Sequence, residues 1–273
     1  MKIALLQMTS GIDPGANAET LEAAIAEAAG QGATMLFTPE MSGLVDSNGA
    51  RAAAHIVAEG DDMVLARVRA AAKRAGIWVH LGSLAVAGGG EDGRWANRAF
   101  VIDAAGEIVA RYDKIHLFDV DLPTGESWRE SSRYAPGGGT CVVETPVGPL
   151  GLSICYDMRF PALFQALSGA GATVLAVPAA FTVPTGQAHW HTLLRARAIE
   201  NACWLVAAAQ VGAHADGRNT YGHSLVVDPW GRVVLDMEDR TGVAVCEIDP
   251  AAVADVRSRV PVIAHRRDIT VPA

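Results

Sequence analysis

The chain has 273 residues, of which half are hydrophobic and 19% are charged, and its formal net charge is −8. This length allows one large domain or two small ones, and the apolar content excludes a largely disordered chain. The acidic balance argues against a general nucleic-acid-binding protein, and no apolar stretch is long enough to predict a membrane-spanning helix. The N-terminal run MKIALLQMTS is too short for a signal peptide and is interpreted as a first buried strand.

Strand and helix patterns alternate along the first third of the chain. Short apolar runs bounded by Gly or Pro predict strands, and apolar residues recurring every three or four positions predict helices. In chain order, we expect a strand at residues 3–6, a helix at 17–29, a strand at 35–37, a helix at 61–75 and a strand at 77–81.

Two features of the strands predict the fold class. The runs at residues 3–6, 173–177 and 204–208 are apolar at nearly every position, so both of their faces are expected to be buried. Each half of the chain also has a hairpin pattern, AFVIDAAGEIVA and LVVDPWGRVVL, in which Gly106 and Gly231 allow a positive φ. The matched hairpins indicate two similar sheets, and no linker marks a boundary. We therefore predict a single α/β domain over residues 1–273.

The segment at residues 118–139 has few apolar residues and is punctuated by Pro and Gly. Loops of this length inside a compact domain are usually functional or disordered. Because it lies between two segments with reactive side chains, we favour a functional loop.

The four cysteines are widely spaced and contain no CxxC pair, which argues against a disulfide scaffold and predicts a reducing, cytoplasmic location. Cys141, Cys203 and Cys246 have apolar, strand-like neighbours and are interpreted as core residues.

Cys155 ends the apolar run GLSIC, shortly before a predicted helix at 161–167. Backbone N–H groups at a helix start would lower the pKa of this thiol. Position alone does not distinguish such a nucleophile from one more core cysteine.

Two charged residues could assist a nucleophile. Glu40 follows an apolar strand, where burial would raise its pKa towards neutral, as a general base requires. Lys114, in RYDKIHLF, would offer a fixed positive charge to an oxyanion. Taken singly, each is more simply a solvated surface charge. Glu130 is a second carboxylate in the loop, and His116 leaves open a papain-like Cys–His pair.

These motifs together resemble a known family. TPE with Glu40, DKIHLFD with Lys114 and GLSICYDMRFP with Cys155 resemble the Glu–Lys–Cys triad of the nitrilase superfamily of carbon–nitrogen hydrolases. The resemblance covers essentially the whole chain, from KIALLQM through AHWHTLLRARAIEN and YGHSLVVDPWG to VPVIAHRR. Within the superfamily the chain is most similar to the Nit amidases, on the segments KIHLFDVDLP, RES and TGQAHW.

The resemblance implies a fold and a set of roles. The fold would be a four-layer αββα sandwich that forms homodimers or larger assemblies through its sheets. Glu40 would be the general base, Cys155 the nucleophile, Lys114 the oxyanion stabiliser and Glu130 a supporting carboxylate. The backbone N–H of Tyr156 would complete the oxyanion hole.

The substrate-binding residues are less closely defined. Arg159 lies where related carbamoyl-amidases contact a substrate carboxylate, but a salt bridge with Asp157 or Glu130 is an equal alternative. Phe181 and Thr182 would line the pocket. The polar insert LPTGES at residues 122–127 and the segment MSGLVDSN after Glu40 depart from the pattern of the animal enzymes, and both would border the pocket.

The expected function is hydrolysis of a short carboxylate-bearing amide, of the deaminated-glutathione type, through a thioester with release of ammonia. Rival activities are an ω-amidase for 2-oxo acid amides and an N-carbamoyl amidohydrolase. A non-catalytic member of the family that only binds a partner is a further alternative, against which the intact Glu40, Lys114 and Cys155 count. The eight histidines form no HExxH motif and no zinc-type spacing, so no metal or other cofactor is expected.

Overall fold

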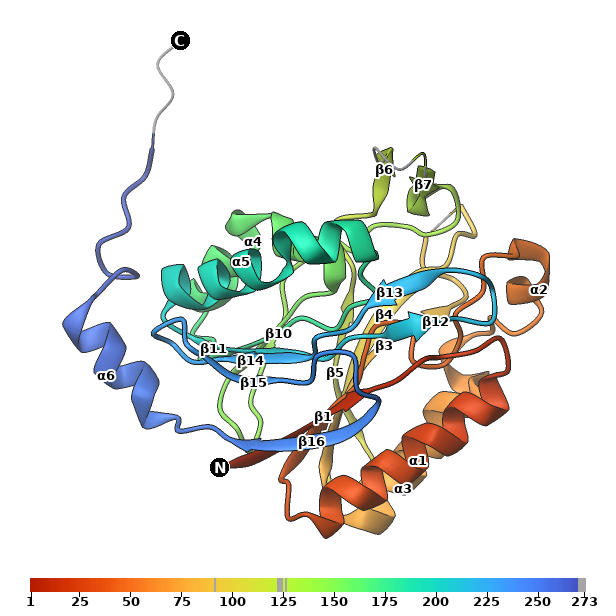
Figure 1. Ribbon diagram of the computed structural model, residues 1–273, viewed down its shortest axis with the longest axis horizontal. Coiled ribbons are helices and arrows are strands. Elements are labelled where there is room, and N and C mark those ends of the chain that lie inside the picture. Colours follow the sequence, from red (N-terminus) through yellow and green to blue (C-terminus); the bar gives the residue numbers. More distant parts are fainter. Residues whose placement is uncertain (91, 122–124, 126, 270–273) are drawn as a thin grey trace.

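The structure is a computed structural model that describes residues 1–90, 92–121, 125 and 127–269. Two six-stranded sheets lie face to face, with helices on the outer side of each (Figure 1). The helices on the first sheet are α1 (Pro14–Gly30) and α3 (Met63–Ala75), and those on the second are α4 (Pro161–Gly169) and α5 (Val183–Asn201). This is the αββα sandwich that the family resemblance implied.

The first sheet has a parallel centre and antiparallel edges. Strands β1, β2 and β3 are parallel, whereas β16, β4 and β5 run antiparallel to their neighbours. In spatial order the strands are β16 (Gly242–Glu247), β1 (Lys2–Gln7), β2 (Met35–Phe37), β3 (Trp78–Val86), β4 (Ala96–Ile102) and β5 (Ile108–Asp113).

The second sheet repeats this layout. Its parallel centre is β9, β10 and β11, and β8, β14 and β15 are antiparallel. In spatial order the strands are β8 (Val142–Val143), β9 (Leu150–Leu152), β10 (Val174–Ala176), β11 (Trp204–Ala207), β14 (Leu225–Val227) and β15 (Val233–Asp236).

The repeated layout confirms the prediction of two similar sheets. The hairpins β4–β5 and β14–β15 occupy corresponding edges, each beside the third parallel strand of its sheet. Their turns contain Gly106 at φ 81° and Gly231 at φ 87°, conformations that most L-residues avoid. A side chain at position 106 would also collide with the carbonyl oxygen of Arg69.

Side-chain alternation explains the continuous apolar runs. Ile3 and Leu5 of β1 belong to the core that includes the second sheet, whereas Ala4 and Leu6 pack with the residues of α1 and α3. Both faces of the strand are therefore buried, as predicted from its composition.

Some boundaries differ from the expected ones. Helix α1 begins at Pro14 and α3 at Met63, because the side chains of Asp13 and Asp62 accept hydrogen bonds from their first-turn N–H groups. The remaining helices are α2 (Gly49–Ala53), α6 (Ala251–Arg259) and the 3₁₀ turns η1 (Glu59–Asp61), η2 (Glu130–Ser132) and η3 (Cys155–Arg159). None of the helices within the described ranges combines the length and apolarity needed to cross a bilayer.

The segment at 118–139 has more regular structure than a loop. It contains the two-stranded ribbon β6 (Asp119–Asp121) and β7 (Ser127–Arg129), followed by η2. These strands are too short and too polar to give an alternating apolar pattern, so the sequence did not predict them. Residues 122–124 and 126 of the polar insert lie outside the described part of the chain. A second ribbon pairs β12 (Val211–Ala213) with β13 (Asn219–Tyr221).

Candidate active site

A cavity of about 590 Å³ collects most of the residues that the sequence singled out. The chain segments that form it are far apart in sequence, from β2 to β13. Seven candidates are among its lining residues, namely Glu40, Lys114, Glu130, Cys155, Tyr156, Phe181 and Thr182. Arg159 is not one of the described residues that line it.

The three central residues follow strand ends. Glu40 and Cys155 each come three positions after a parallel strand, β2 and β9, and Lys114 follows β5 directly. Carboxyl ends of parallel strands meet at one edge of a sheet, where ligands commonly bind. Cys155 has a left-handed φ of 47°, and Met41, next to Glu40, has a φ of 54°. Such strained conformations of non-glycine residues cluster at functional sites.

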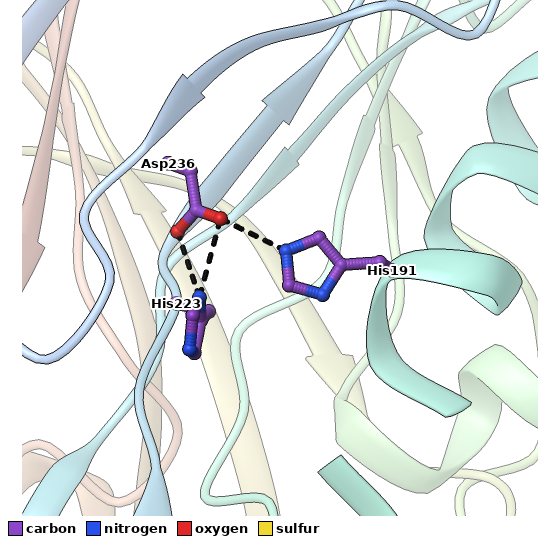
Figure 2. Close-up of side chains that lie close together, drawn as sticks. All are labelled: His191, His223 and Asp236. Carbon is purple, nitrogen blue, oxygen red and sulfur yellow. Dashed lines mark hydrogen bonds and ion pairs between the residues drawn. The ribbon is translucent and has the colours of Figure 1, made fainter. Parts of the chain in front are cut away.

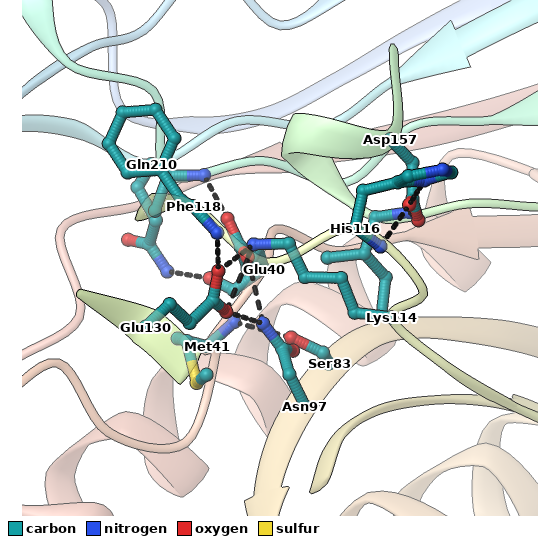
Figure 3. A network of polar contacts seen from close by, with 12 residues as sticks. Glu40, Met41, Ser83, Asn97, Lys114, His116, Phe118, Glu130, Asp157 and Gln210 are labelled. Carbon is teal, nitrogen blue, oxygen red and sulfur yellow. Dashed lines mark hydrogen bonds and ion pairs between the residues drawn. The ribbon is translucent and has the colours of Figure 1, made fainter. Parts of the chain in front are cut away.

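The carboxylate of Glu40 is buried and fully engaged (Figure 3). Its Oε1 accepts hydrogen bonds from Lys114 Nζ at 3.0 Å and Asn97 Nδ2 at 2.9 Å. Its Oε2 accepts one from the backbone N–H of Ala180 at 2.8 Å. The position of the carboxylate is therefore fixed by three different segments.

Lys114 lies between two carboxylates. Its ammonium group donates to Glu40 at 3.0 Å and to Glu130 Oε2 at 2.8 Å, and the residue is 2% exposed. Glu130 also accepts hydrogen bonds from the backbone N–H of Phe118 at 2.6 Å and from Asn97 Nδ2 at 3.2 Å. The Lys114 side chain is thus held in one orientation, with its charge compensated on both sides (Figure 3).

The electrostatics correct two of the predictions. Burial alone would raise the pKa of Glu40, as expected, but the charge of Lys114 and hydrogen bonds from Cys155, Lys114 and Asn97 outweigh burial and lower that pKa. The pKa of the Cys155 thiol is raised, not lowered, first by burial and then by the negative charge of Glu40. Burial disfavours the charged form of Lys114, but Glu130 and Glu40 keep its pKa well above the ordinary value. The resting site therefore holds a carboxylate, an ammonium and a neutral thiol.

The turn after Cys155 explains the second correction. Residues 155–159 form a 3₁₀ turn of five residues instead of the start of α4. The Asp157 carboxylate, and not the thiol, accepts the N–H of Ile154 at 2.9 Å. Helix α4 begins at Pro161, six residues after the thiol, so its first-turn N–H groups belong to a different turn from Cys155.

Two positioning residues were missed. Asn97 contacts both glutamates and lies at the start of the hairpin strand β4, where no sequence signal identified it. Asp157 is fully buried and accepts hydrogen bonds from the Tyr112 hydroxyl at 2.7 Å and the His116 backbone N–H at 3.0 Å, besides Ile154. Asp157 thereby ties the Cys155 turn to the segment of Lys114; its place two residues after the cysteine was the available signal.

Arg159 and His116 have other contacts. The Arg159 guanidinium lies 5.3 Å from the ring centre of Phe181, and its Nη1 lies 3.3 Å from His189 Nδ1. Within the described part of the chain it forms no salt bridge with either acid considered for it. His116 Nδ1 lies 2.7 Å from Asp157, and its ring stacks on Phe160 at 3.6 Å. These contacts do not support a papain-like Cys–His pair.

Comparison with known proteins agrees with this geometry. Residues 2–258 match the carbon-nitrogen hydrolase family. The chain is 40% identical over 269 residues to the deaminated glutathione amidase of Yersinia enterocolitica, covering 98% of this chain and 93% of the relative.

Solved structures give the same result. The Caenorhabditis elegans NitFhit protein superposes with a TM-score of 0.89 at 41% identity, over 97% of this chain and 65% of that longer chain. An amidase variant from Nesterenkonia sp. AN1, with acrylamide added at its active-site cysteine, superposes with a TM-score of 0.78 at 29% identity, over 96% and 98% of the two chains.

The fold and the cavity with its buried cysteine, lysine and glutamate define a hydrolase of the nitrilase superfamily type. The chain belongs to the carbon-nitrogen hydrolase family, and it is an enzyme that acts on carbon–nitrogen bonds.

Proposed function

We propose that the chain is a cysteine amidase that hydrolyses a short carboxylate-bearing amide of the deaminated-glutathione type. The observation that carries this proposal is the cluster of Cys155, Glu40 and Lys114, joined by hydrogen bonds and charge at the wall of one cavity. A nucleophile needs a base and a group that stabilises the oxyanion, and the three side chains provide these functions.

In the first half of the reaction, Cys155 Sγ attacks the amide carbonyl carbon while Glu40 accepts the thiol proton. The raised pKa of the thiol and the lowered pKa of Glu40 place this proton on sulfur at rest, where a base must remove it. The carbonyl oxygen becomes an oxyanion, which Lys114 and the backbone N–H of Tyr156 stabilise. Within the described residues that N–H donates to no other acceptor, which leaves it available.

In the second half, the carbon–nitrogen bond breaks and Glu40 returns its proton to the departing nitrogen, so ammonia leaves and a thioester remains. Glu40 then takes a proton from water, whose oxygen attacks the thioester carbon. Collapse of this intermediate releases the acid, and the proton returns to the Cys155 sulfur. Glu130 supports both halves by holding Lys114, to which both of its oxygens bind.

The substrate carboxylate needs a cation in the cavity. Arg133 and Arg218 both line it. Arg218 is paired with the buried Asp216 at 2.8 Å, whereas Arg133 forms no ion pair with any described residue. Gly49 leaves space for the Arg133 guanidinium, since a side chain there would approach it to 2.7 Å. We therefore favour Arg133 as the carboxylate-binding residue and keep Arg159 as the alternative that the sequence suggested.

We also infer a homodimer in a reducing, cytoplasmic location. The free cysteines support the location, because stable disulfides are rare in reducing compartments. The exposed Trp230, Val233 and Val234 support self-association, since they form an apolar stretch on the edge strand β15 and its turn. Sedimentation of the purified chain should give twice the mass of 28.5 kDa; a concentration-independent monomer would contradict the dimer.

Ammonia release from a panel of substrates tests the activity. The panel contains deaminated glutathione, a neutral short amide, a 2-oxo acid amide, a ureide and a simple nitrile. We expect the highest kcat/KM for deaminated glutathione, with a thioester on Cys155 detected by mass spectrometry. A better neutral amide or nitrile would contradict the substrate class, and an adduct on another residue would contradict the mechanism.

A further inference from the structure

A second cluster of ionisable side chains lies outside the cavity. His191 of α5, His223 before β14 and Asp236 at the end of β15 point towards one another (Figure 2). His191 Nε2 lies 2.9 Å from Asp236 Oδ2, and His223 Nδ1 lies 3.0 Å from Asp236 Oδ1. None of the three is among the described residues that line the cavity of Cys155.

The ligand atoms have the chemistry and spacing of a zinc site. Two imidazole nitrogens and one carboxylate oxygen are ligands that Zn²⁺ prefers. Tetrahedral bonds of about 2.0–2.2 Å place neighbouring ligand atoms about 3.3 Å apart. The three candidate ligand atoms all lie within 4.8 Å of one another, so an ion would need only small side-chain shifts.

The backbone around these residues is already fixed. His223 has a left-handed φ of 56°, its N–H donates to the Glu238 carbonyl at 2.7 Å, and its carbonyl accepts from Trp190 Nε1 at 2.8 Å. Asp236 Oδ1 accepts the N–H of Glu238 at 2.8 Å. Supporting contacts of this kind hold metal ligands in the orientation that binding requires and thereby increase the affinity of the site for the metal.

The cluster is also open enough for an ion to enter. The side chain of His191 is 37% exposed, and those of His223 and Asp236 are about one-quarter exposed. Tyr221 stacks on the His223 ring at 4.4 Å and fixes the plane of that ring. Water would complete the coordination on the exposed side.

We propose that His191, His223 and Asp236 form a Zn²⁺ site that ties α5 to the β14–β15 hairpin. The ligands come from three separate segments, which is why histidine spacing in the sequence did not predict a metal. Without an ion the carboxylate bridges two imidazoles by hydrogen bonds. The ion replaces these bonds with stronger ones and stabilises the folded state, because the ligands are together only when the chain is folded.

The test is a metal titration of the full chain after removal of metal with EDTA and dialysis. Co²⁺ should give the visible absorption of a tetrahedral site, and one equivalent of Zn²⁺ should abolish it. Mutation of a residue that only supports a metal ligand typically weakens metal binding by about 10–100-fold. His191→Gln and His223→Asn each remove a ligand, so each should weaken Zn²⁺ binding by at least this factor. Asn is chosen at position 223 because it tolerates a positive φ.

His189→Gln is the matched control, since it removes a histidine from the same helix but outside the cluster. It should bind Zn²⁺ as the unmodified chain does, and Zn²⁺ should raise the Tm of both but not of the two cluster variants. The proposal is wrong if the unmodified chain takes up no stoichiometric Zn²⁺. It is also wrong if both cluster variants keep full affinity, or if the control loses as much affinity as they do.

Discussion

Cys155 has a backbone conformation that a core cysteine does not need. Its φ of 47° is strained for a cysteine, at a cost of about 1–3 kcal/mol. Cys203, by contrast, is fully buried and its Sγ lies 3.2 Å from the carbonyl oxygen of Ala172. Substitution of these two cysteines can therefore test the proposed nucleophile against a core cysteine.

We expect Cys155→Ala to abolish ammonia release and to leave the free energy of unfolding nearly unchanged, because Ala replaces a small side chain without new contacts. Cys203→Ala should keep kcat but lower the free energy of unfolding by about 1 kcal/mol, a typical cost of a core substitution. Steady-state assays and urea denaturation measure both quantities. If the Cys155 variant released ammonia as fast as the unmodified chain, Cys155 would not be the nucleophile.

The proton distribution in the site predicts a broad pH profile. In the proposed mechanism, activity needs ionised Glu40, whose pKa is lowered below the usual 4.5, and a protonated Cys155 thiol, whose pKa is raised above 9.0. As pH falls, activity should be lost only below about pH 4.5, and as pH rises it should persist to about pH 9. kcat/KM should therefore be flat between these limits, with circular dichroism as the control for folding.

Glu40→Gln should lower kcat by about 10²-fold or more across the whole flat region, since no carboxylate remains to move the proton. An acid limb near pH 7 in the unmodified chain would instead support the raised Glu40 pKa that the sequence suggested.

At the scale of the elements, the apolar pattern of the sequence predicted the positions of several strands, whereas the polar contacts between distant segments were not predicted. The strands at 35–37, 173–177 and 204–208 were placed within one residue of β2, β10 and β11, because burial on both faces leaves a continuous apolar run. Strand ends likewise predicted the neighbourhood of Glu40 and Cys155.

Long-range polar contacts gave no such pattern. Asn97 and the Ala180 N–H reach Glu40 from positions 57 and 140 residues away. The Glu40 pKa is lowered instead of raised mainly by the charge of Lys114, 74 residues away, with hydrogen bonds from Cys155, Lys114 and Asn97 adding to it. The short ribbon β6–β7 escaped prediction for a related reason, since its strands bury little apolar surface.

Asp157 links two elements, the Cys155 turn and the end of β5. In Asp157→Asn one carboxylate oxygen becomes an NH₂ group that faces a donor, so a buried donor loses its acceptor. We expect the free energy of unfolding to fall by about 1–3 kcal/mol, and kcat to fall as well. Tyr112→Phe, which removes a single donor to the same carboxylate, should cost less on both counts. Equal effects of the two variants on urea unfolding and on kcat would show that Asp157 does not hold the turn.

At the scale of the whole molecule, the net charge is negative, whereas several positively charged side chains line the cavity. The net charge of −8 does not attract an anionic substrate, so positive charge near the cavity must do so locally. Arg129, Arg133 and Arg218 line the cavity with Lys114, but Arg129 is paired with Asp121 and Arg218 with Asp216. Among the described residues that line the cavity, Arg133 is therefore the arginine without an ion pair.

If Arg133 binds the substrate carboxylate, Arg133→Ala should raise KM for carboxylate-bearing amides by about 10–100-fold, the worth of one charged hydrogen bond. kcat and the KM of neutral amides should change little, because the lost contact is the same in the ground and transition states. Added salt should raise the KM of the unmodified chain for anionic amides and that of the variant much less. Arg159→Ala is the matched comparison, since its guanidinium lies over the Phe181 ring. If only the Arg159 variant shows a selective increase in KM, Arg159 binds the carboxylate, as the sequence suggested. If a variant instead loses kcat equally on all amides, the arginine replaced in it is a structural residue.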